Sequence, residues 1–171
     1  MFTTPSDLRA DCTRCCGLCC VAPAFYAGQG FGFDKPAHQP CAHLGQDHRC
    51  AVHDGLASRG FPACATFECY GAGQRVTQQL FGGKSWQSSP ELALHMFEAY
   101  RRYRVLHELM AMLGVAIERA SLVDAASLRD RRRMLDGLCE SGAALADACR
   151  VQVLRQEVLV QIRGVLRASG V

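Results

Sequence analysis

Hydrophobic residues recur with a helical period in the second half of this chain. After Pro90, apolar side chains follow one another at steps of three and four residues, the spacing of one buried face of an α-helix. The stripe consists of Leu92, Met96, Tyr100, Tyr103, Leu106 or His107, Met110 and Leu113. Ser89 suits the N-cap and Pro90 the first helical position. The pattern predicts a long amphipathic helix that ends near Gly114.

Two further helices are predicted closer to the C-terminus. The first covers about residues 121–139, and Gly142 separates it from a last helix over about residues 143–168. The buried stripe of the last helix is predicted to contain Leu145, Cys149, Leu154, Val158, Ile162 and Val165. On these helices, Cys139 and Cys149 are interpreted as small buried hydrophobes. Three helices with short connections pack as an antiparallel bundle, so residues 86–171 are expected to form one.

Residues 1–85 have no sustained hydrophobic period and are rich in glycine and cysteine. Nine of the eleven cysteines lie between Cys12 and Cys69. Such a segment buries little apolar surface, so crosslinks must hold it, and metal ligation supplies folding energy directly. The expected fold is mainly α, with an irregular cysteine-rich metal-binding module over residues 1–85 packed on the three-helix antiparallel bundle.

The compartment affects how the cysteines are interpreted. The first residues show no basic region followed by an apolar one, and no run reaches the roughly 18 apolar residues of a membrane span. We therefore expect a cytoplasmic protein without membrane contact, where thiols stay reduced and metal ligation is favoured over disulfides. A disulfide scaffold is the weaker alternative, because the cysteine count is odd. The formal charge of +3 ignores thiolates, so it does not indicate a nucleic-acid partner.

The cysteine-rich opening has the spacing of a metal site. It reads Cys12-Thr-Arg-Cys15-Cys16-Gly-Leu-Cys19-Cys20. Two cysteines separated by two residues are typical of zinc and iron–sulfur sites. Consecutive side chains of an extended chain point to opposite faces, so Cys19 and Cys20 are predicted to serve two sites or two irons of one cluster.

Four segments together resemble the zinc- or iron-chelating CxxCxxCC family (YkgJ-like proteins). They are Cys12-x-x-Cys15-x-Gly-Leu-Cys19-Cys20, Pro40-Cys41-x-x-Leu44, Cys50-x-Val52-His53-Asp54 and Arg59-Gly-Phe-x-x-Cys64-x-x-Phe67-x-Cys69. The extension from Phe67 to Gly83 looks like the subgroup at the N-terminus of actinobacterial pentapeptide-repeat proteins, over about residues 7–115. The chain has no pentapeptide repeats, carries one extra residue in its opening, and has Gly60-Phe61 where the common form has proline.

The resemblance implies a set of metal ligands and leaves the downstream role open. The ligands would be Cys12, Cys15, Cys19, Cys20, Cys41, Cys50, Cys64 and Cys69, with Cys16 as the odd cysteine out. Eight thiolates fit two four-cysteine zinc sites, an iron–sulfur cluster plus a zinc, or a polynuclear site, and each arrangement holds more than one metal ion. The expected function is metal binding, and a protein partner is kept open beside the metal ions. The alternative is a metal-dependent enzyme, either an iron–sulfur oxidoreductase or a protein-modifying enzyme resembling the flagellin lysine methylase.

Other candidate residues carry weaker signals. His43 and His48 are interpreted as solvated loop residues. For His53 two interpretations stay open, a group that binds or supports the metal and a solvated loop residue. His107 is interpreted as a core histidine, and the glycine-rich segment 28–33 is rejected as a nucleotide loop because it does not open a helix. The arginines of residues 131–133 are interpreted as a solvated helix face.

Overall fold

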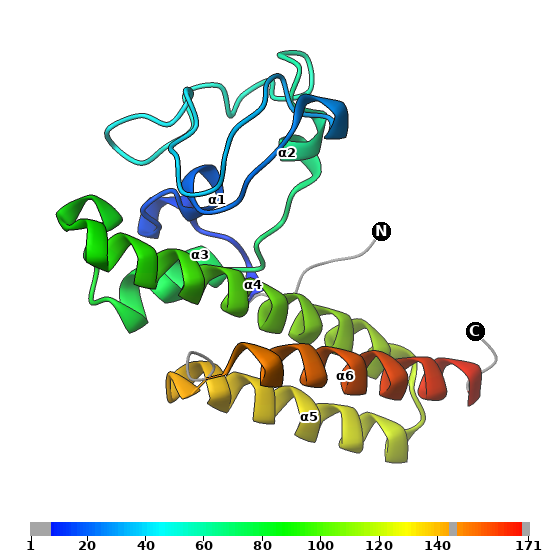
Figure 1. The fold of residues 1–171 in the computed structure, drawn as a ribbon. Helices are drawn as coiled ribbons and strands as arrows, with labels where there is room; N and C mark the ends of the chain where they lie inside the picture. The colour runs from blue at the N-terminus through cyan, green and yellow to red at the C-terminus, as the bar shows by residue number, and fades with distance from the viewer. Residues whose placement is uncertain (1–7, 144–146, 169–171) are drawn as a thin grey trace. The chain divides into compact units, whose positions relative to one another are not determined.

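The computed structural model describes residues 8–143 and 147–168, which form two compact units (Figure 1). One unit, the cysteine unit, is Ala10–Arg101; the other, the helical unit, comprises the described residues of Met1–Arg9 and Arg102–Val171. Helix α4 (Pro90–Arg119) contributes residues to both units. The fold is mainly helical, as predicted, and the described residues contain isolated β-bridges but no β-strand.

The start of α4 is confirmed and its predicted end is wrong. The Oγ of Ser89 accepts a hydrogen bond from the backbone N–H of Leu92 at 3.1 Å, so Ser89 caps the helix that Pro90 begins. The helix continues through Gly114 to Arg119. A glycine inside a helix costs only about 1 kcal/mol relative to alanine. Burial of Ala116 in the next turn helps to offset that cost, because a continued helix keeps this side chain in the core.

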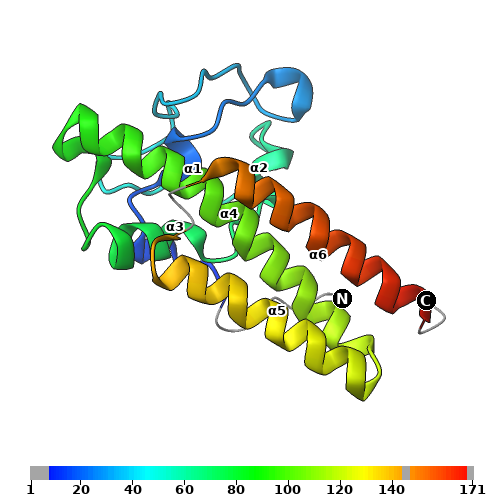
Figure 2. The same ribbon diagram turned by 60° about the horizontal axis from the view of Figure 1, so that its bottom comes forward.

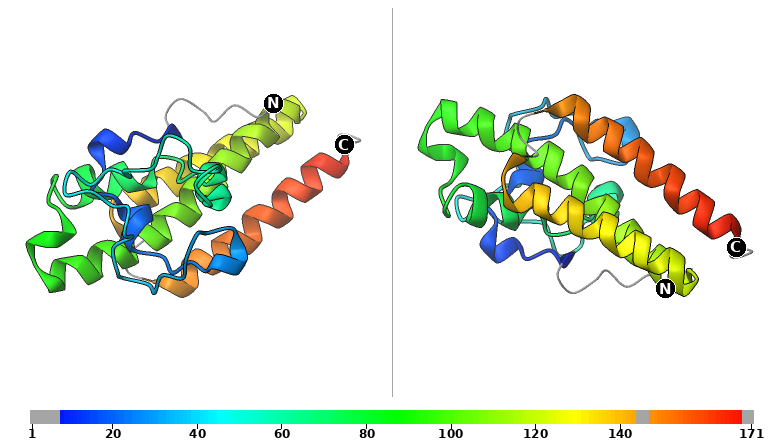
Figure 3. Two further views of the ribbon diagram at one scale, coloured as in Figure 1. Left: turned by 90° about the horizontal axis from the view of Figure 1, so that it is seen from above. Right: turned by 90° about the horizontal axis from the view of Figure 1, so that it is seen from below.

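Three helices lie side by side in the helical unit (Figures 2 and 3). They are the part of α4 after Arg101, α5 (Leu122–Glu140) and α6 (Ala148–Ala168), and successive helices run in opposite directions. Their shared core contains Tyr103, Leu106, Leu109, Met110, Leu113, Leu128, Leu135 and Val158. The hydroxyl of Tyr103 donates to the carbonyl of Cys139 at 2.7 Å, which joins α4 to the end of α5.

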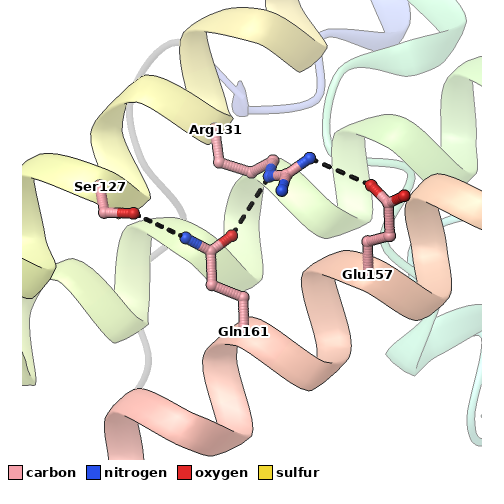
Figure 4. Close-up of polar contacts among 4 residues, drawn as sticks. All are labelled: Ser127, Arg131, Glu157 and Gln161. Carbon is pink, nitrogen blue, oxygen red and sulfur yellow. Dashed lines mark hydrogen bonds and ion pairs between the residues drawn. The ribbon is translucent and has the colours of Figure 1, made fainter.

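A polar contact joins α5 to α6 (Figure 4). Arg131 donates to Gln161 and pairs with Glu157, each at 3.2 Å, and Gln161 donates to Ser127 at 3.0 Å. The expectation that Arg131 lies on a fully solvated face was therefore wrong, because its side chain is about two thirds buried. The guanidinium still reaches solvent at its edge, as long cationic side chains generally do.

The stripe predicted for α6 is confirmed from Leu154 onward but not at its start. Leu154, Val158, Ile162 and Val165 are buried, and Leu145 lies outside the described residues. Cys149 is exposed, which corrects its interpretation as a buried hydrophobe, whereas Cys139 is buried as predicted. The first buried residue of α6 is Val151. Two residues correspond to about 200° around a helix, so Cys149 points away from the face that Val151 buries.

The cysteine unit consists of short elements joined by loops. They are η2 (Cys12–Arg14), α1 (Leu18–Val21), η3 (Ala27–Gln29), α2 (Pro62–Thr66), α3 (Ala72–Arg75), the π-helical turn η4 (Val76–Leu80) and η5 (Trp86–Ser88). Two antiparallel bridges, Phe25 with Lys35 and Leu44 with Cys50, tie the loops together. Among the described residues no helix is both long and apolar enough to span a bilayer.

Candidate functional site

All eight predicted ligand cysteines belong to the cysteine unit, and none of the eight is in a disulfide. The opening run is shaped by Gly17, which has a left-handed φ of +71° and precedes α1. A Cβ at this position would lie 2.8 Å from Cδ1 of Leu44 and 3.0 Å from the backbone oxygen of His48. Glycine therefore allows the sharp turn that separates Cys15 from the two cysteines of α1.

Cys19 and Cys20 lie on helix α1 with their sulfur atoms 3.8 Å apart, so the expectation that they point to opposite faces of an extended chain was wrong. The two thiols are hydrogen-bonded, and either can be the donor. With Cys19 as the donor, this bond lowers the pKa of Cys20, and the nearby ammonium of Lys35 acts in the same direction. The same hydrogen bond, together with burial, raises the pKa of Cys19. The two adjacent thiols therefore differ in their readiness to ionise.

Cys69 interacts electrostatically with three other cysteines. Cys15 lies against α3, where a Cβ at Gly73 would be 2.7 Å from its sulfur, and Cys69 accepts a backbone hydrogen bond from Ala72 at the start of α3. Burial is the main cause of the raised pKa of Cys12 and of Cys15, whose pKa reaches about 11. The charge of Cys69 contributes to the raised pKa of three thiols, Cys12, Cys15 and Cys19. We call Cys12, Cys15, Cys19 and Cys69 the first set.

Four other cysteines form a second set around Cys20. The backbone N–H of Cys41 donates to the carbonyl of Cys20 at 2.9 Å, and the bridge between Leu44 and Cys50 brings Cys50 back beside this segment. Burial, followed by the charges of Cys20, Cys41 and Cys50, raises the pKa of Cys64 to about 11. Burial likewise raises the pKa of Cys41 and Cys50, to which the charge of Cys20 adds. We call Cys20, Cys41, Cys50 and Cys64 the second set.

Backbone N–H groups point at the sulfur atoms of three cysteines. The N–H of His43 donates to Cys41 at 3.5 Å, and the N–H of Val52 donates to Cys50. Cys15 accepts from two backbone groups, those of Gly17 and Leu18. These bonds oppose the effect of burial on the pKa, because a donor aimed at sulfur stabilises the thiolate. The turns that follow these cysteines therefore favour the ionised form that a metal requires.

The thiols of the two sets are neighbours but do not form a finished coordination shell. Within residues 8–143 and 147–168, no group of three or more histidine, cysteine, aspartate and glutamate side chains converges closely enough to hold a metal ion. Sulfur ligands of a tetrahedral zinc ion lie about 3.8 Å apart, given a Zn–S bond of about 2.3 Å. Neither set has that arrangement among the described residues.

Cys16 has different surroundings from both sets. It is 3% exposed, and its sulfur lies 3.4 Å from the hydroxyl of Thr77. The same hydroxyl accepts the backbone N–H of Cys16, while Trp86 donates to the Cys16 carbonyl at 2.8 Å. Cys16 thus occupies a packed contact with η4 and η5.

Two of the three loop histidines are packed rather than solvated. His43 is half-buried and meets the ring of Phe61 edge-on at 5.2 Å, and His48 is half-buried beside Trp86. The expectation that both are solvated was therefore wrong. His53 is exposed and lies 3.8 Å from the carboxylate of Asp54. His107 is buried in the helical unit, as predicted.

Sequence reasoning missed Lys35, which is 3% exposed. Its ammonium donates to the carbonyls of Val21, Pro23, Pro36 and Gln39 at 3.3, 2.6, 3.0 and 2.8 Å. The same nitrogen lies 5.0 Å from the ring centre of Phe25. The sequence did contain a signal for Lys35, namely the rarity of lysine. This chain uses arginine for nearly all its cationic side chains and has only one other lysine, Lys84.

Comparison with known proteins gives one similar sequence. The uncharacterized protein YybG of Bacillus subtilis (strain 168) is 42% identical to this chain over 111 residues, which cover 65% of this chain and 40% of the relative. The chain thus spans about two fifths of the length of that relative, whose name assigns no activity. No family model matches the chain, and no solved structure matches it.

Proposed function

We propose that this protein binds metal at two sites, with a zinc ion or an iron–sulfur cluster held by each set of four cysteines. The proposal is supported by the eight thiols of the cysteine unit. Among them the charge of Cys69 acts on Cys12, Cys15 and Cys19, and the charge of Cys20 acts on Cys41, Cys50 and Cys64. Backbone donors aimed at Cys15, Cys41 and Cys50 support it further, because hydrogen bonds to sulfur stabilise the metal-bound thiolate.

The residues fit a soft metal ion. All eight side chains are thiols, which select zinc and iron–sulfur clusters over harder cations. The raised pKa of Cys15 and Cys64, about 11 in each case, means that these thiols are protonated at neutral pH until a metal displaces the proton. Four thiolates bound to one zinc ion would fill its tetrahedral shell and leave no open position, which favours a structural or interaction role over catalysis at the metal.

Metal analysis of single-cysteine variants tests the proposal. The protein is purified anaerobically, and its metal content is measured together with a visible spectrum, which separates a coloured iron–sulfur cluster from colourless zinc. The wild type should hold one zinc ion or one iron–sulfur cluster at each of two sites per chain. Cys15→Ser and Cys64→Ser should each lose one, since each removes a ligand from a different set.

Cys149→Ser is the matched control, because Cys149 is exposed on α6 in the other unit. It should keep metal at both sites. Loss of all metal from either ligand variant would contradict two separate sites and favour a shared polynuclear site, in which Cys19 and Cys20 bind one cluster. A wild type that retains no metal after anaerobic purification and reconstitution would contradict metal binding itself.

A further inference from the structure

Lys35 is enclosed by a cage of backbone carbonyls. Four oxygens lie between 2.6 and 3.3 Å from its nitrogen, and the face of Phe25 covers another side. An ammonium suits this cage because it is a compact charge with three rotatable donors, whereas a guanidinium is a planar fork. Burying such a charge is costly unless it is bonded and balanced by negative charge. The carbonyls provide the hydrogen bonds but carry no net charge.

The cage is built from the two segments that position Cys20 and Cys41. Val21 is the last residue of α1 and directly follows Cys20, while Gln39 precedes Cys41 by two residues. Lys35 bonds to the carbonyls of both Val21 and Gln39. Removal of the ammonium would therefore leave the buried carbonyl of Val21 and the partly buried carbonyl of Gln39 without this donor at the junction of these segments.

The two sets of cysteines have different electrostatic surroundings. Lys35 interacts favourably with the charges of Cys20 and Cys41, both members of the second set. In the first set, the negative charges of Asp11 and Glu68 contribute to the raised pKa of Cys12. Four thiolates around one divalent ion carry an excess of negative charge, so a cation nearby stabilises the loaded site and a carboxylate destabilises it.

We propose that Lys35 is a positioning residue for a metal ion held by the second set. Its caged ammonium fixes Cys20 beside Cys41 and offsets part of the charge of the thiolates, so that the second set binds metal more tightly than the first. This inference rests on the proposed function, since it concerns the same two sites.

Competition with a zinc chelator tests the inference. Two zinc affinities are measured for the wild type, and Cys64→Ser identifies which belongs to the second set. Lys35→Met removes the charge and keeps the length of the side chain. It should weaken the second affinity by about 10–100-fold, the usual cost of losing a group that supports a metal ligand. Lys84→Met, which alters the exposed lysine, should leave both affinities unchanged.

Chemical rescue separates a role of the charge from simple loss of packing. Lys35→Ala leaves room for a free alkylamine, so propylammonium chloride should restore much of the lost affinity. Tetramethylammonium chloride at the same concentration should not, because it has no N–H donors. Lys35→Ala is also refolded with zinc in each salt, and the yield of folded protein is measured. Poor folding of the variant is then detected as a low yield.

Each result decides a different point. Two zinc sites in Lys35→Met with wild-type affinities would overturn the role of Lys35 and leave the proposed function standing. Equal recovery of Lys35→Ala in both salts would overturn the role of the ammonium. A wild type without zinc binding would instead remove the proposed function on which the inference depends.

Discussion

Cys15 and Cys16 are adjacent in the chain but lie in different environments. Cys15 accepts two backbone hydrogen bonds at its sulfur and belongs to the first set, whereas Cys16 is packed against Thr77. A serine at position 16 keeps a group that can bond to the threonine hydroxyl. A serine at position 15 removes a thiolate that no hydroxyl replaces as a metal ligand.

We therefore expect Cys16→Ser to be mild and Cys15→Ser to be severe. The first should cost about 1 kcal/mol of unfolding free energy or less, in the range of ordinary substitutions. The second should cost several kcal/mol, because structural zinc sites contribute roughly 10–16 kcal/mol in small peptides. Metal content and melting curves of the two variants measure the difference. Equal loss of metal from both would place Cys16 among the ligands.

Burial of the thiols predicts opposite pH dependences for the metal-free and metal-loaded protein. The folded pKa of Cys15 and Cys64 is about 11, above the ordinary value of 9.0. The metal-free protein gains stability from this difference below about pH 9 and loses it as the pH rises towards 11, since the unfolded thiols ionise first. The loaded protein should lose stability as the pH falls, because protons compete with the metal.

Denaturation of both forms at several pH values between 5 and 11 provides the measurement. Metal-free protein is prepared under reducing conditions so that thiols do not oxidise. The prediction is contradicted if the free energy of unfolding of both forms changes with pH in the same direction. The thiols that ionise would then not be those that bind metal.

At the scale of elements, the turn before α1 depends on a single glycine. Gly17→Ala should destabilise the cysteine unit by about 1–3 kcal/mol, because a left-handed non-glycine residue is strained and the new Cβ meets Leu44 and the backbone of His48. Gly28→Ala is the control, since a Cβ there meets no atom within 4 Å. Urea denaturation of both variants tests this, and a comparable loss in Gly28→Ala would show that the turn has no special requirement.

Helices illustrate what the sequence could and could not predict. Ser89 and Pro90 define the start of α4, because capping is a local interaction between neighbouring residues. The end was missed because Gly114 is a weak helix breaker whose cost is opposed by tertiary packing of Ala116. Cys149 was misassigned for a related reason, since the buried face of α6 is set by the helices beside it.

For the candidate site too, the sequence predicts some features and tertiary contacts decide the others. The eight cysteines could be selected by their spacing, and all eight fall in one unit. Their grouping around Cys69 and Cys20 depends on contacts between distant segments, such as the one between Cys41 and Cys20. The rarity of lysine marked Lys35 as unusual, but its role was missed because backbone carbonyls form its cage, and the sequence does not show where backbone groups lie.

For the whole molecule, the two units should respond differently to metal removal. The cysteine unit consists of short elements and loops, whereas α5 and α6 share an apolar core that needs no ligand. Trypsin should cut the chelated protein first at the exposed Arg49 and Arg59, while α5 and α6 stay resistant. Mass spectrometry of the early fragments checks the order, with metal-loaded protein as the control. Uniform resistance of the chelated protein would mean that packing alone holds the cysteine unit.

The cage around Lys35 has a practical consequence for labelling the protein. The chain has two lysines, of which Lys84 is exposed and Lys35 is buried. An acylating reagent should therefore modify one lysine side chain rapidly and the other only when the carbonyl cage opens. The rate of acylation of Lys35 is followed by peptide mass. It then measures the rate of local unfolding around the second set. A single reactive surface lysine also offers one defined point for attaching a fluorophore or tethering the molecule to a sensor.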